Sequence, residues 1–305
     1  MSQKIIAILG PTASGKTALA VEIAKKFNGE IISADSRQVF RRLDLGTGKD
    51  LDEYGSVKYH LIDICDPAEK FTLFQWLTLA RRAINDIHSR EKLPIIVGGT
   101  NLYVRALVEG FEIKNPKSKI ENFNSKSKIY SRDNLNKLPS NKLGKILEKL
   151  NPEALKTIDQ KNPRRLIRAI EIAQEGSAVI KTKPDFEVLQ IAIDIEREQL
   201  YANIDKRADT RFEQGMLEEV EGLIKSGVNT DWLQGLGLEY KIISSFALGK
   251  DKTPEEFEKM KQELKWKSHQ YAKRQLSWLR NLTKPIWVKD KNQALKLVKK
   301  FLKNK

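Results

Sequence analysis

Cysteine and histidine are scarce in this sequence of 305 residues. Its single cysteine, Cys65, excludes an internal disulfide and any zinc site built from cysteine. With only three histidines, a metal cage made by the protein alone is not expected. The neighbours of Cys65 predict a buried thiol at the end of a strand.

Long apolar runs are also missing. None approaches the roughly 18 residues of a membrane span, so we expect no membrane partner. The chain enters its first predicted strand too soon for a signal peptide, which predicts a cytoplasmic protein. The 40% hydrophobic content is enough for a large core, in one domain with an insertion or in two domains.

Acidic residues are outnumbered in only one part of the chain. Residues 1–110 carry a net charge of +2, whereas the remaining residues carry +13 of the total of +15. Residues 265–305 hold 13 basic residues and one acidic residue, Asp290. This asymmetry favours a polyanionic partner such as nucleic acid, although a solvated basic surface would have the same composition.

The most informative stretch is IIAILGPTASGKT, residues 5–17. Its apolar start predicts a short buried strand, and apolar residues from Leu19 to Phe27 repeat at helical spacing after it. A G-x-x-x-x-G-K-T motif between a strand and a helix is typical of a phosphate-binding loop. In such a loop the glycines let backbone N–H groups surround an anion, and the helix N-terminus adds positive charge.

The residues of this predicted diphosphate- or nucleotide-binding loop have separate roles. Lys16 would reach a terminal phosphate, and the Thr17 hydroxyl would ligate Mg²⁺. The loop consists of Gly10, Pro11, Thr12, Ala13, Ser14, Gly15, Lys16 and Thr17. The motif alone does not distinguish a diphosphate from a triphosphate.

Strands and helices alternate through the first 110 residues. Strands are predicted at 30–35, 59–64 and 94–100, and Thr72 is predicted to cap a helix that reaches about Arg90. This alternation predicts an α/β fold with a doubly wound parallel sheet of the P-loop type. A further strand at 188–195 indicates that the sheet resumes after an insertion. We therefore expect a catalytic core formed by 1–110 and 188–305.

Two predicted strand ends carry groups suited to catalysis. Asp35 follows the second strand, and Thr100 follows Gly98-Gly99 after another. Ligands of open α/β sheets bind at the carboxyl ends of strands, so Asp35 is a candidate base near the phosphate loop. A helix-capping or Mg²⁺-orienting carboxylate is the alternative. The Thr100 hydroxyl could bind a phosphate or leaving-group oxygen.

The segment 111–187 differs in composition from the rest. Residues 111–150 hold 10 basic and 4 acidic residues with few apolar positions, which predicts a mobile insertion with little core of its own. Helical periodicity returns before residue 150, and a helix is predicted at 162–172, so the insertion is expected to be small and mainly helical. Arg164 and Arg168 lie one turn apart there and could bind phosphate, or pair with Glu171 at the surface.

Two later helices carry further candidates. Arg207 and Arg211 lie four residues apart and are flanked by Asp205, Asp209 and Glu213. They could stabilise a departing diphosphate, or both could sit in ion pairs within the helix. The segment SHQYAKRQLSWLR, residues 268–280, mixes aromatic and cationic residues. This mixture is typical of single-stranded RNA recognition, although its leucines could equally belong to the core.

Taken together, these motifs resemble the tRNA dimethylallyltransferases (isopentenyltransferases, or IPP transferase family). GPTASGKT, ADSRQVF with LGTGK, HLIDICDP, FTLFQW, IIVGGTNLYVRAL, NPRRLIRAIEI, RADTRF and QYAKRQLSWLR occur in that family's order and cover nearly the whole chain. The resemblance implies transfer of a dimethylallyl group from dimethylallyl diphosphate (DMAPP) to the exocyclic amino nitrogen of the adenosine 3′ of the tRNA anticodon. Diphosphate is released, with Mg²⁺ as cofactor and the anticodon stem-loop as partner.

The resemblance also assigns residue roles. Asp35 would be the base, Thr100 would bind the leaving oxygen, and Lys16, Arg207 and Arg211 would hold the diphosphate. The implied tRNA-binding residues are Asp35, Ser36, Arg37, Gln38, Arg164, Arg165, Arg168, Lys273, Arg274 and Gln275. A monomer is expected.

Three rival functions remain open on the sequence. A nucleoside or nucleotide kinase would use the same loop and arginines, but would not need the basic aromatic helix. A prenyltransferase acting on free adenine nucleotides would have little use for the basic remainder. A non-catalytic RNA-binding protein would leave Lys16, Asp35 and Thr100 without a task.

Overall fold

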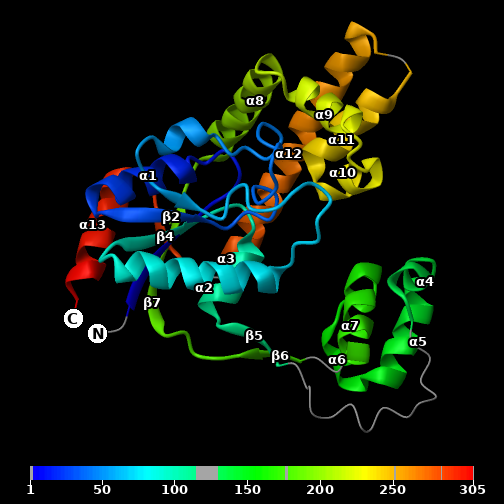
Figure 1. Ribbon diagram of the computed structural model, residues 1–305, viewed down its shortest axis with the longest axis horizontal. Coiled ribbons are helices and arrows are strands. Elements are labelled where there is room, and N and C mark those ends of the chain that lie inside the picture. The colour runs from blue at the N-terminus through cyan, green and yellow to red at the C-terminus, as the bar shows by residue number, and fades with distance from the viewer. Residues whose placement is uncertain (1–2, 115–129, 176–177, 251, 283, 305) are drawn as a thin grey trace. The chain divides into compact units, whose positions relative to one another are not determined.

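The computed structural model describes the chain except for residues 1–2, 115–129, 176–177, 251, 283 and 305 (Figure 1). Contacts between Cα atoms divide it into two compact units. The first comprises Met1–Val108 and Pro184–Lys305, and the second is Glu109–Lys183.

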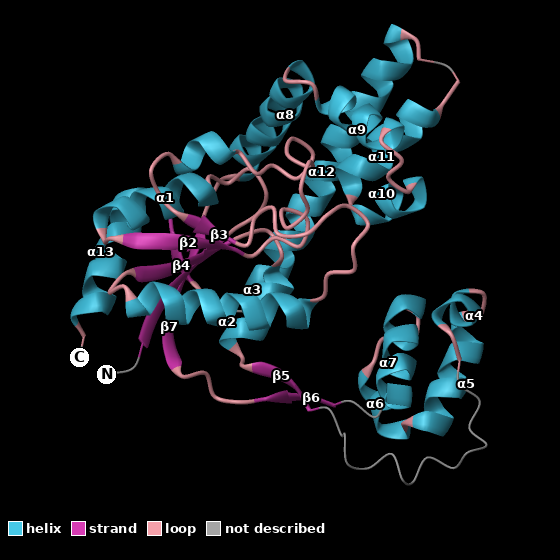
Figure 2. Ribbon diagram, viewed as in Figure 1, coloured by secondary structure: helices cyan, strands magenta, loops and turns pink. Residues whose placement is uncertain are grey.

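A parallel sheet of six strands forms the centre of the first unit (Figure 2). Its order is β3-β2-β4-β1-β7-β8, and every neighbouring pair is parallel. All carboxyl ends therefore lie at one edge of the sheet, which confirms the predicted fold class. The strands are β1 (Gln3–Leu9), β2 (Gly29–Ser33), β3 (Tyr59–His60), β4 (Leu93–Val97), β7 (Phe186–Ile193) and β8 (Ile286–Val288).

Helices cover both faces of this sheet (Figure 1). Alternate strand residues such as Ile6, Ile31 and Ile95 form a core with helices α1 (Lys16–Lys26) and α13 (Lys291–Lys303). Helix α2 (Leu73–Ser89) contacts β2 and β4, and α3 (Asn101–Val108) packs beside α2. Thr72 caps α2 as predicted, through a hydrogen bond from the Gln75 N–H.

Five more helices follow β7 in the chain and build a second core with the segment after β2 (Figure 1). Val39 and Leu43 of that segment pack with Val220, Tyr240 and Leu264. The helices are α8 (Arg197–Glu213), α9 (Met216–Lys225), α10 (Thr230–Leu236), α11 (Leu238–Leu248) and α12 (Pro254–Leu282). Across the described residues, no helix has an apolar stretch long enough to cross a membrane.

Four predicted strands extended too far. β2 ends at Ser33, β3 at His60, β4 at Val97 and β7 at Ile193, where ends at 35, 64, 100 and 195 were expected. The physical reason at β3 is the backbone: Leu61 and Asp63 have φ of 64° and 56°, which strand geometry forbids.

At the opposite edge of the sheet, the Glu30 carboxylate is buried at the start of β2. It accepts hydrogen bonds from Arg90 Nη2 and Lys92 Nζ, each at 2.9 Å, and pairs with His60 Nε2 at 2.7 Å. Although burial acts to raise it, the bonds from Arg90, His60 and Lys92 hold the pKa of Glu30 far below its usual value. This cluster joins β2, β3 and the segment that leads into β4.

The second unit is small and mainly helical, and it has a core of its own. Helices α4 (Arg132–Asn136), α5 (Ser140–Leu150), α6 (Pro152–Thr157) and α7 (Pro163–Glu175) accompany the antiparallel pair β5 (Phe111–Lys114) and β6 (Ala178–Lys181). The buried side chains include Leu135, Leu143, Leu147, Leu166 and Ile170. The expectation of little core was therefore wrong, because sparse leucines at helical spacing meet α7. The lysine- and asparagine-rich stretch 115–129, on which mobility was predicted, lies outside the described residues.

Candidate active site

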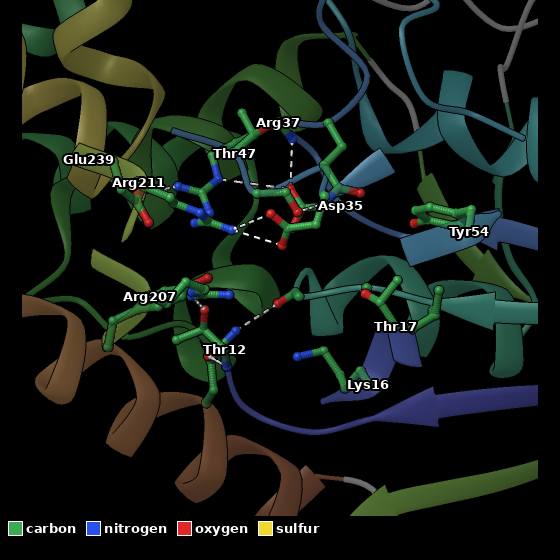
Figure 3. Close-up of a pocket in the computed structure, with 18 residues that line it drawn as sticks. Thr12, Lys16, Thr17, Asp35, Arg37, Thr47, Tyr54, Arg207, Arg211 and Glu239 are labelled. Atoms are coloured by element: carbon green, nitrogen blue, oxygen red, sulfur yellow. Dashed lines mark hydrogen bonds and ion pairs between the residues drawn. The ribbon is translucent and has the colours of Figure 1, made fainter. Parts of the chain in front are cut away.

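A polar pocket opens at the carboxyl edge of the sheet (Figure 3). Four sources supply its walls: the loop after β1, the segment after β2, the turn after β4, and helices α8, α11 and α12. The lining residues are Thr12, Lys16, Thr17, Asp35, Arg37, Gln38, Thr47, Gly48, Asp50, Tyr54, Val97, Gly98, Gly99, Arg207, Arg211, Glu239, Tyr271 and Gln275. The structure thus brings together the predicted phosphate loop, the predicted base and both α8 arginines.

The phosphate loop has the backbone that its glycines permit. Gly10 has φ of 154°, and a Cβ added there would lie 2.7 Å from Ser14 Oγ. Gly15 has φ of 82° and directly precedes α1, which begins at Lys16. The Lys16 ammonium donates a hydrogen bond to the Pro11 carbonyl oxygen inside the loop. The loop therefore has the strand–loop–helix context and the N–H groups that an anion site requires.

Helix α8 brings two arginines to the pocket. Arg207 Nη2 donates to the Thr12 hydroxyl. Arg211 is 6% exposed, and its Nη2 lies 2.9 Å from Asp50 Oδ2. Its Nε atom is buried without a hydrogen-bond partner.

The alternative of ion pairs within α8 was wrong for its two aspartates. Both face α12, because Asp205 pairs with His269 at 2.7 Å and Asp209 pairs with Lys265 at 2.7 Å. Their side chains hold the two helices together, and Arg207 and Arg211 are left to the pocket.

Burial and mutual repulsion weaken proton binding by the cations of this site. Burial first, and then the positive charge of Arg207, lower the pKa of Lys16 to about 7, although Asp35 opposes this. Burial and the neighbouring Arg211 lower the pKa of Arg207 to about 10. Cations gathered with too little negative charge are suited to an anionic ligand. Its binding would raise the pKa values of Lys16 and Arg207 back toward their ordinary values.

Asp35 lies two residues beyond β2 and is 8% exposed. Its Oδ1 accepts a hydrogen bond of 2.9 Å from the Arg37 N–H. A Cβ at Gly99 would lie 3.1 Å from Asp35 Oδ2, so the glycine after β4 provides the space for this carboxylate. The carboxylate faces the same pocket as Lys16 (Figure 3).

The three residues after Asp35 have specific partners inside the protein. The Arg37 guanidinium forms an ion pair with Glu239 of α11. Burial acts to lower the pKa of Arg37, but Glu239 and Asp35 raise it above its ordinary value. Gln38 donates to the Gly48 carbonyl oxygen at 2.8 Å, and Ser36 N–H donates to Thr100 Oγ1 at 3.0 Å.

Thr100 is outside the set of residues that line the pocket. Its hydroxyl also contacts Ser36 Oγ at 3.2 Å, so the side chain bridges the β4 turn and the segment after β2.

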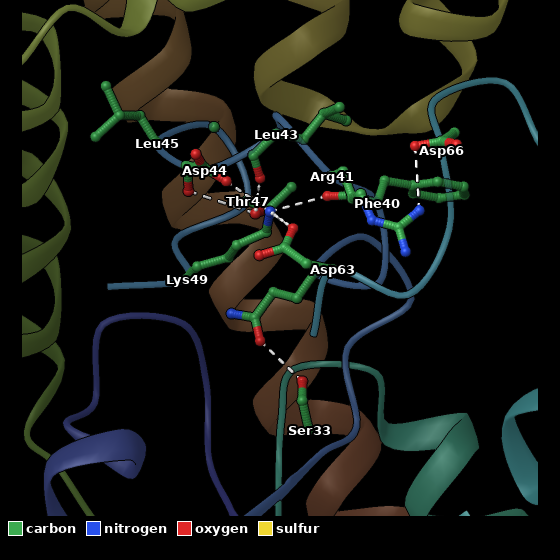
Figure 4. Close-up of polar contacts among 12 residues, drawn as sticks. Ser33, Phe40, Arg41, Leu43, Asp44, Leu45, Thr47, Lys49, Asp63 and Asp66 are labelled. Carbon is green, nitrogen blue, oxygen red and sulfur yellow. Dashed lines mark hydrogen bonds and ion pairs between the residues drawn. The ribbon is translucent and has the colours of Figure 1, made fainter. Parts of the chain in front are cut away.

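The segment between β2 and η1 (Leu51–Tyr54) is held together by Lys49 (Figure 4) and is also held by contacts from α9. Lys49, 1% exposed, donates to the Phe40 carbonyl oxygen at 2.9 Å and pairs with Asp44 at 2.6 Å. From α9, the Glu219 carboxylate accepts bonds from three successive N–H groups, those of Asp44, Leu45 and Gly46, at 2.8, 2.7 and 3.1 Å. It also accepts from the Tyr240 hydroxyl at 2.7 Å. These contacts fix the loop that presents Gly48 and Asp50 to Arg211.

Helix α12 divides the predicted RNA-binding residues. Lys273 and Arg274 are exposed, whereas Gln275 is 5% exposed and lines the pocket. Two aromatic residues expected to stack on RNA have other neighbours. Tyr271 lines the pocket, and His269 stacks on Tyr201 of α8 with ring centroids 4.1 Å apart.

The arginines of the second unit are at its surface. Arg164, Arg165 and Arg168 are all exposed on α7. Arg168 Nη1 lies 3.1 Å from Glu171, which also pairs with Arg132. The surface pairing considered for Arg168 is therefore present.

The donors around the pocket fit Mg²⁺ bound through a substrate. Thr17 lines the pocket with Asp35 and Asp50. Within the described ranges, no group of three His, Cys, Asp or Glu could hold a metal ion. Mg²⁺ commonly takes one or two protein oxygens and completes its shell with phosphate oxygens and water.

Sequence reasoning missed several lining residues. Asp50, Gly48 and Glu239 were not singled out, although the first two belong to or follow the LGTGK motif. The two glycines and the lysine of LGTGK, in the segment after a predicted strand, were the available indication that this segment could line a site. Glu239 carried none, since only tertiary packing brings α11 to Arg37.

Comparison with family models agrees with this geometry. The model described as IPP transferase matches residues 38–282, and the model described as isopentenyl transferase matches residues 3–58. A tRNA dimethylallyltransferase of Streptococcus pneumoniae is 40% identical over 284 residues, which is 92% of this chain and 90% of the relative. The chain belongs to the IPP transferase family. A tRNA dimethylallyltransferase of Geotalea uraniireducens is 37% identical to this member over 99% of its chain and 98% of the relative.

Solved structures of the IPP transferase family share its fold. The tRNA isopentenylpyrophosphate transferase of Bacillus halodurans is 34% identical, covers 98% of this chain and 95% of its own, and gives a TM-score of 0.68. A eukaryotic dimethylallyltransferase acting on tRNA is 25% identical, covers 100% of this chain and 80% of its own, and gives a TM-score of 0.77.

Proposed function

We propose that this protein transfers a dimethylallyl group from DMAPP to the exocyclic amino nitrogen of the adenosine 3′ of the anticodon in tRNA, releasing diphosphate. One observation carries the proposal: in a member of the IPP transferase family, an anion-binding loop and a buried carboxylate line a single pocket. The relatives named above as tRNA dimethylallyltransferases support the choice of substrates.

The first requirement is to stabilise the leaving group. When the allylic C–O bond breaks, its electron pair stays on diphosphate, which gains negative charge. The loop N–H groups, Lys16, Arg207 and Arg211 would stabilise that charge, and Thr100 would donate to the leaving oxygen. Mg²⁺, held by Thr17 and phosphate oxygens, would supply further neutralisation.

The second requirement is to remove a proton from the nucleophile. The lone pair of an adenine amino group is delocalised into the ring, so the nitrogen is a weak nucleophile. As the new C–N bond forms, Asp35 would take one amine proton and leave a neutral secondary amine. Its position beside Gly99 and across from the phosphate loop supports this role.

The target adenosine must leave its stack to enter a pocket of this kind. Asp35, Ser36, Arg37 and Gln38 would surround its approach. The exposed Arg164, Arg165, Arg168, Lys273 and Arg274 would contact the RNA backbone. A monomeric state and a cytoplasmic location stay predictions.

A product analysis tests the proposal against its rivals. The protein is incubated with Mg²⁺, DMAPP and either unmodified tRNA or AMP, and the masses of the products are measured by mass spectrometry. We expect one dimethylallyl group on tRNA and none on AMP. A mass gain on AMP would support a prenyltransferase of free nucleotides, and phosphate transfer from ATP would support a kinase.

A further inference from the structure

We propose that Gln275 is a positioning residue that couples tRNA docking on α12 to the diphosphate site. The inference rests on the proposed function. In it, Gln275 positions the loops that carry the reacting groups and does not itself contact RNA. Its burial motivates the proposal, since its side chain is 5% exposed while Lys273 and Arg274 beside it are exposed.

Both ends of the Gln275 amide are engaged, each with the backbone of a different loop. Its Oε1 accepts a hydrogen bond of 2.8 Å from the Thr12 N–H in the phosphate loop. Its Nε2 donates a bond of 3.1 Å to the Gly99 carbonyl oxygen after β4. A carboxamide offers a donor and an acceptor in one rigid plane, so a single side chain satisfies both backbone groups.

The two loops joined by this bridge hold opposite sides of the proposed reaction. Thr12 is also held through its hydroxyl by Arg207, on the side of the diphosphate. At Gly99, an added Cβ would lie 3.1 Å from Asp35 Oδ2 and 3.5 Å from Gln275 Nε2. One side chain therefore links the anion loop to the turn that accommodates the base.

Helix α12 gives this bridge a rigid connection to the protein surface. Ala272, one turn before Leu276, is fully buried with Leu200 and Ile204 of α8 and packs near Ala13 of the phosphate loop. Lys273 and Arg274 face outward between these buried positions. A shift of α12 caused by RNA on its outer face would move Gln275 with it. By reciprocity, a diphosphate ligand would change tRNA affinity by the same factor.

The Gln275→Met variant tests the bridge, because it keeps an unbranched side chain and removes both hydrogen bonds. Titration with inorganic diphosphate and Mg²⁺, without RNA, should show roughly tenfold weaker binding, as expected when two buried backbone groups lose their partner. The tRNA affinity measured without diphosphate should change less than about twofold. The increase in tRNA affinity that diphosphate causes in the wild type should disappear.

Gln275→Glu supplies a rescue that a merely structural role would not show. A protonated carboxyl has both a donor and an acceptor and can replace the amide, and burial raises the pKa of a carboxyl. Diphosphate binding by Gln275→Glu, relative to Gln275→Met at each pH, should therefore recover as the pH falls from about 8 to about 6. A ratio that does not change with pH would contradict the bridge.

Matched variants on the same helix separate the alternatives. Lys273→Ala with Arg274→Ala should weaken tRNA binding and leave diphosphate binding unchanged, whereas Gln262→Met, at an exposed position, should change neither. If Gln275→Met weakens tRNA binding alone, it is an RNA contact and the proposal is overturned. Equal losses of both affinities with a lower melting temperature would also overturn it. Inorganic diphosphate binding needs no prenylation, so failure of the proposed function is distinguishable from failure of this one.

Discussion

The two ends of β2 hold buried carboxylates in opposite surroundings. At the amino end, Glu30 meets Arg90, Lys92 and His60 within hydrogen-bonding distance. Past the carboxyl end, Asp35 faces a pocket in which Lys16 and Arg207 crowd one another. The first cluster is complete within the protein, and the second has more cations than its carboxylates satisfy.

This difference means that the Glu30 cluster serves stability, whereas the pocket around Asp35 serves function. A complete cluster stabilises the fold, because its cations lose a partner if the carboxylate is removed. An incomplete cluster costs stability in the free protein, and that cost is recovered when an anion binds. Mutations at the two ends should therefore change different measurements.

The largest expected effect is on turnover at Asp35. Asp35→Ala should lower kcat for tRNA prenylation by more than about a hundredfold, because no group is left to take the amine proton. tRNA affinity should stay within about twofold, measured by filter binding alongside single-turnover rates. A parallel loss of affinity and rate would contradict the role of base.

At the other end of β2, Glu30→Gln should act on stability and leave catalysis unchanged. The variant keeps the shape, leaves Lys92 without a counter-charge and leaves Arg90 with Asp86 alone. We expect the free energy of unfolding to fall by about 2 kcal/mol, less than for fully buried pairs because these cations are about one-third exposed. Urea denaturation measures this, and an unchanged kcat well below the melting temperature is the control.

The low pKa of Lys16 predicts a pH dependence of DMAPP binding. A free-state pKa of about 7 means that Lys16 is largely neutral at pH 8, whereas an adjacent diphosphate favours the charged form. Affinity should therefore fall as the pH rises above about 7, by at most about tenfold per unit. Calorimetry without tRNA measures it, and Lys16→Met should bind more weakly with a flat profile over the same range. A steep profile in Lys16→Met would assign the titration to another group.

The smallest effect is expected at Arg90, one of three partners of Glu30. Arg90→Ala should lower the free energy of unfolding by less than Glu30→Gln does, since Lys92 and His60 still compensate the carboxylate. The loss should be smaller in the Glu30→Gln background, as a double-mutant cycle would measure. Additive losses would mean that Arg90 acts through Asp86, with which it also pairs at 2.7 Å.

Local patterns predicted the parts of the site that lie on consecutive residues. The loop from Gly10 to Thr17 sits between β1 and α1 as its motif required, and Asp35 lies at the carboxyl edge because all strands are parallel. The insertion was misjudged from its composition. Its leucines at 135, 143 and 147 already had helical spacing, and they find partners on α7.

Contacts between distant segments could not be predicted from such patterns. Gln275 was expected to contact tRNA from the family resemblance, and only the crossing of α12 over the phosphate loop shows that its amide binds Thr12 and Gly99. Arg211 meets Asp50 for a similar reason. The loop at Gly48, whose φ is 65°, lies so close to α8 that a Cβ on this residue would be 2.2 Å from Arg211 Nη2.

Besides the phosphate loop, the protein has a second concave set of backbone N–H groups, and this set binds the Glu219 carboxylate. The N–H groups of Asp44, Leu45 and Gly46 converge on one anion, much as the loop around Lys16 is built to do. Because that anion is covalently part of α9, it never dissociates and never competes with diphosphate. The same arrangement of backbone N–H groups thus binds an internal carboxylate at Glu219 and, in the loop around Lys16, would bind a diphosphate that is released at every turnover.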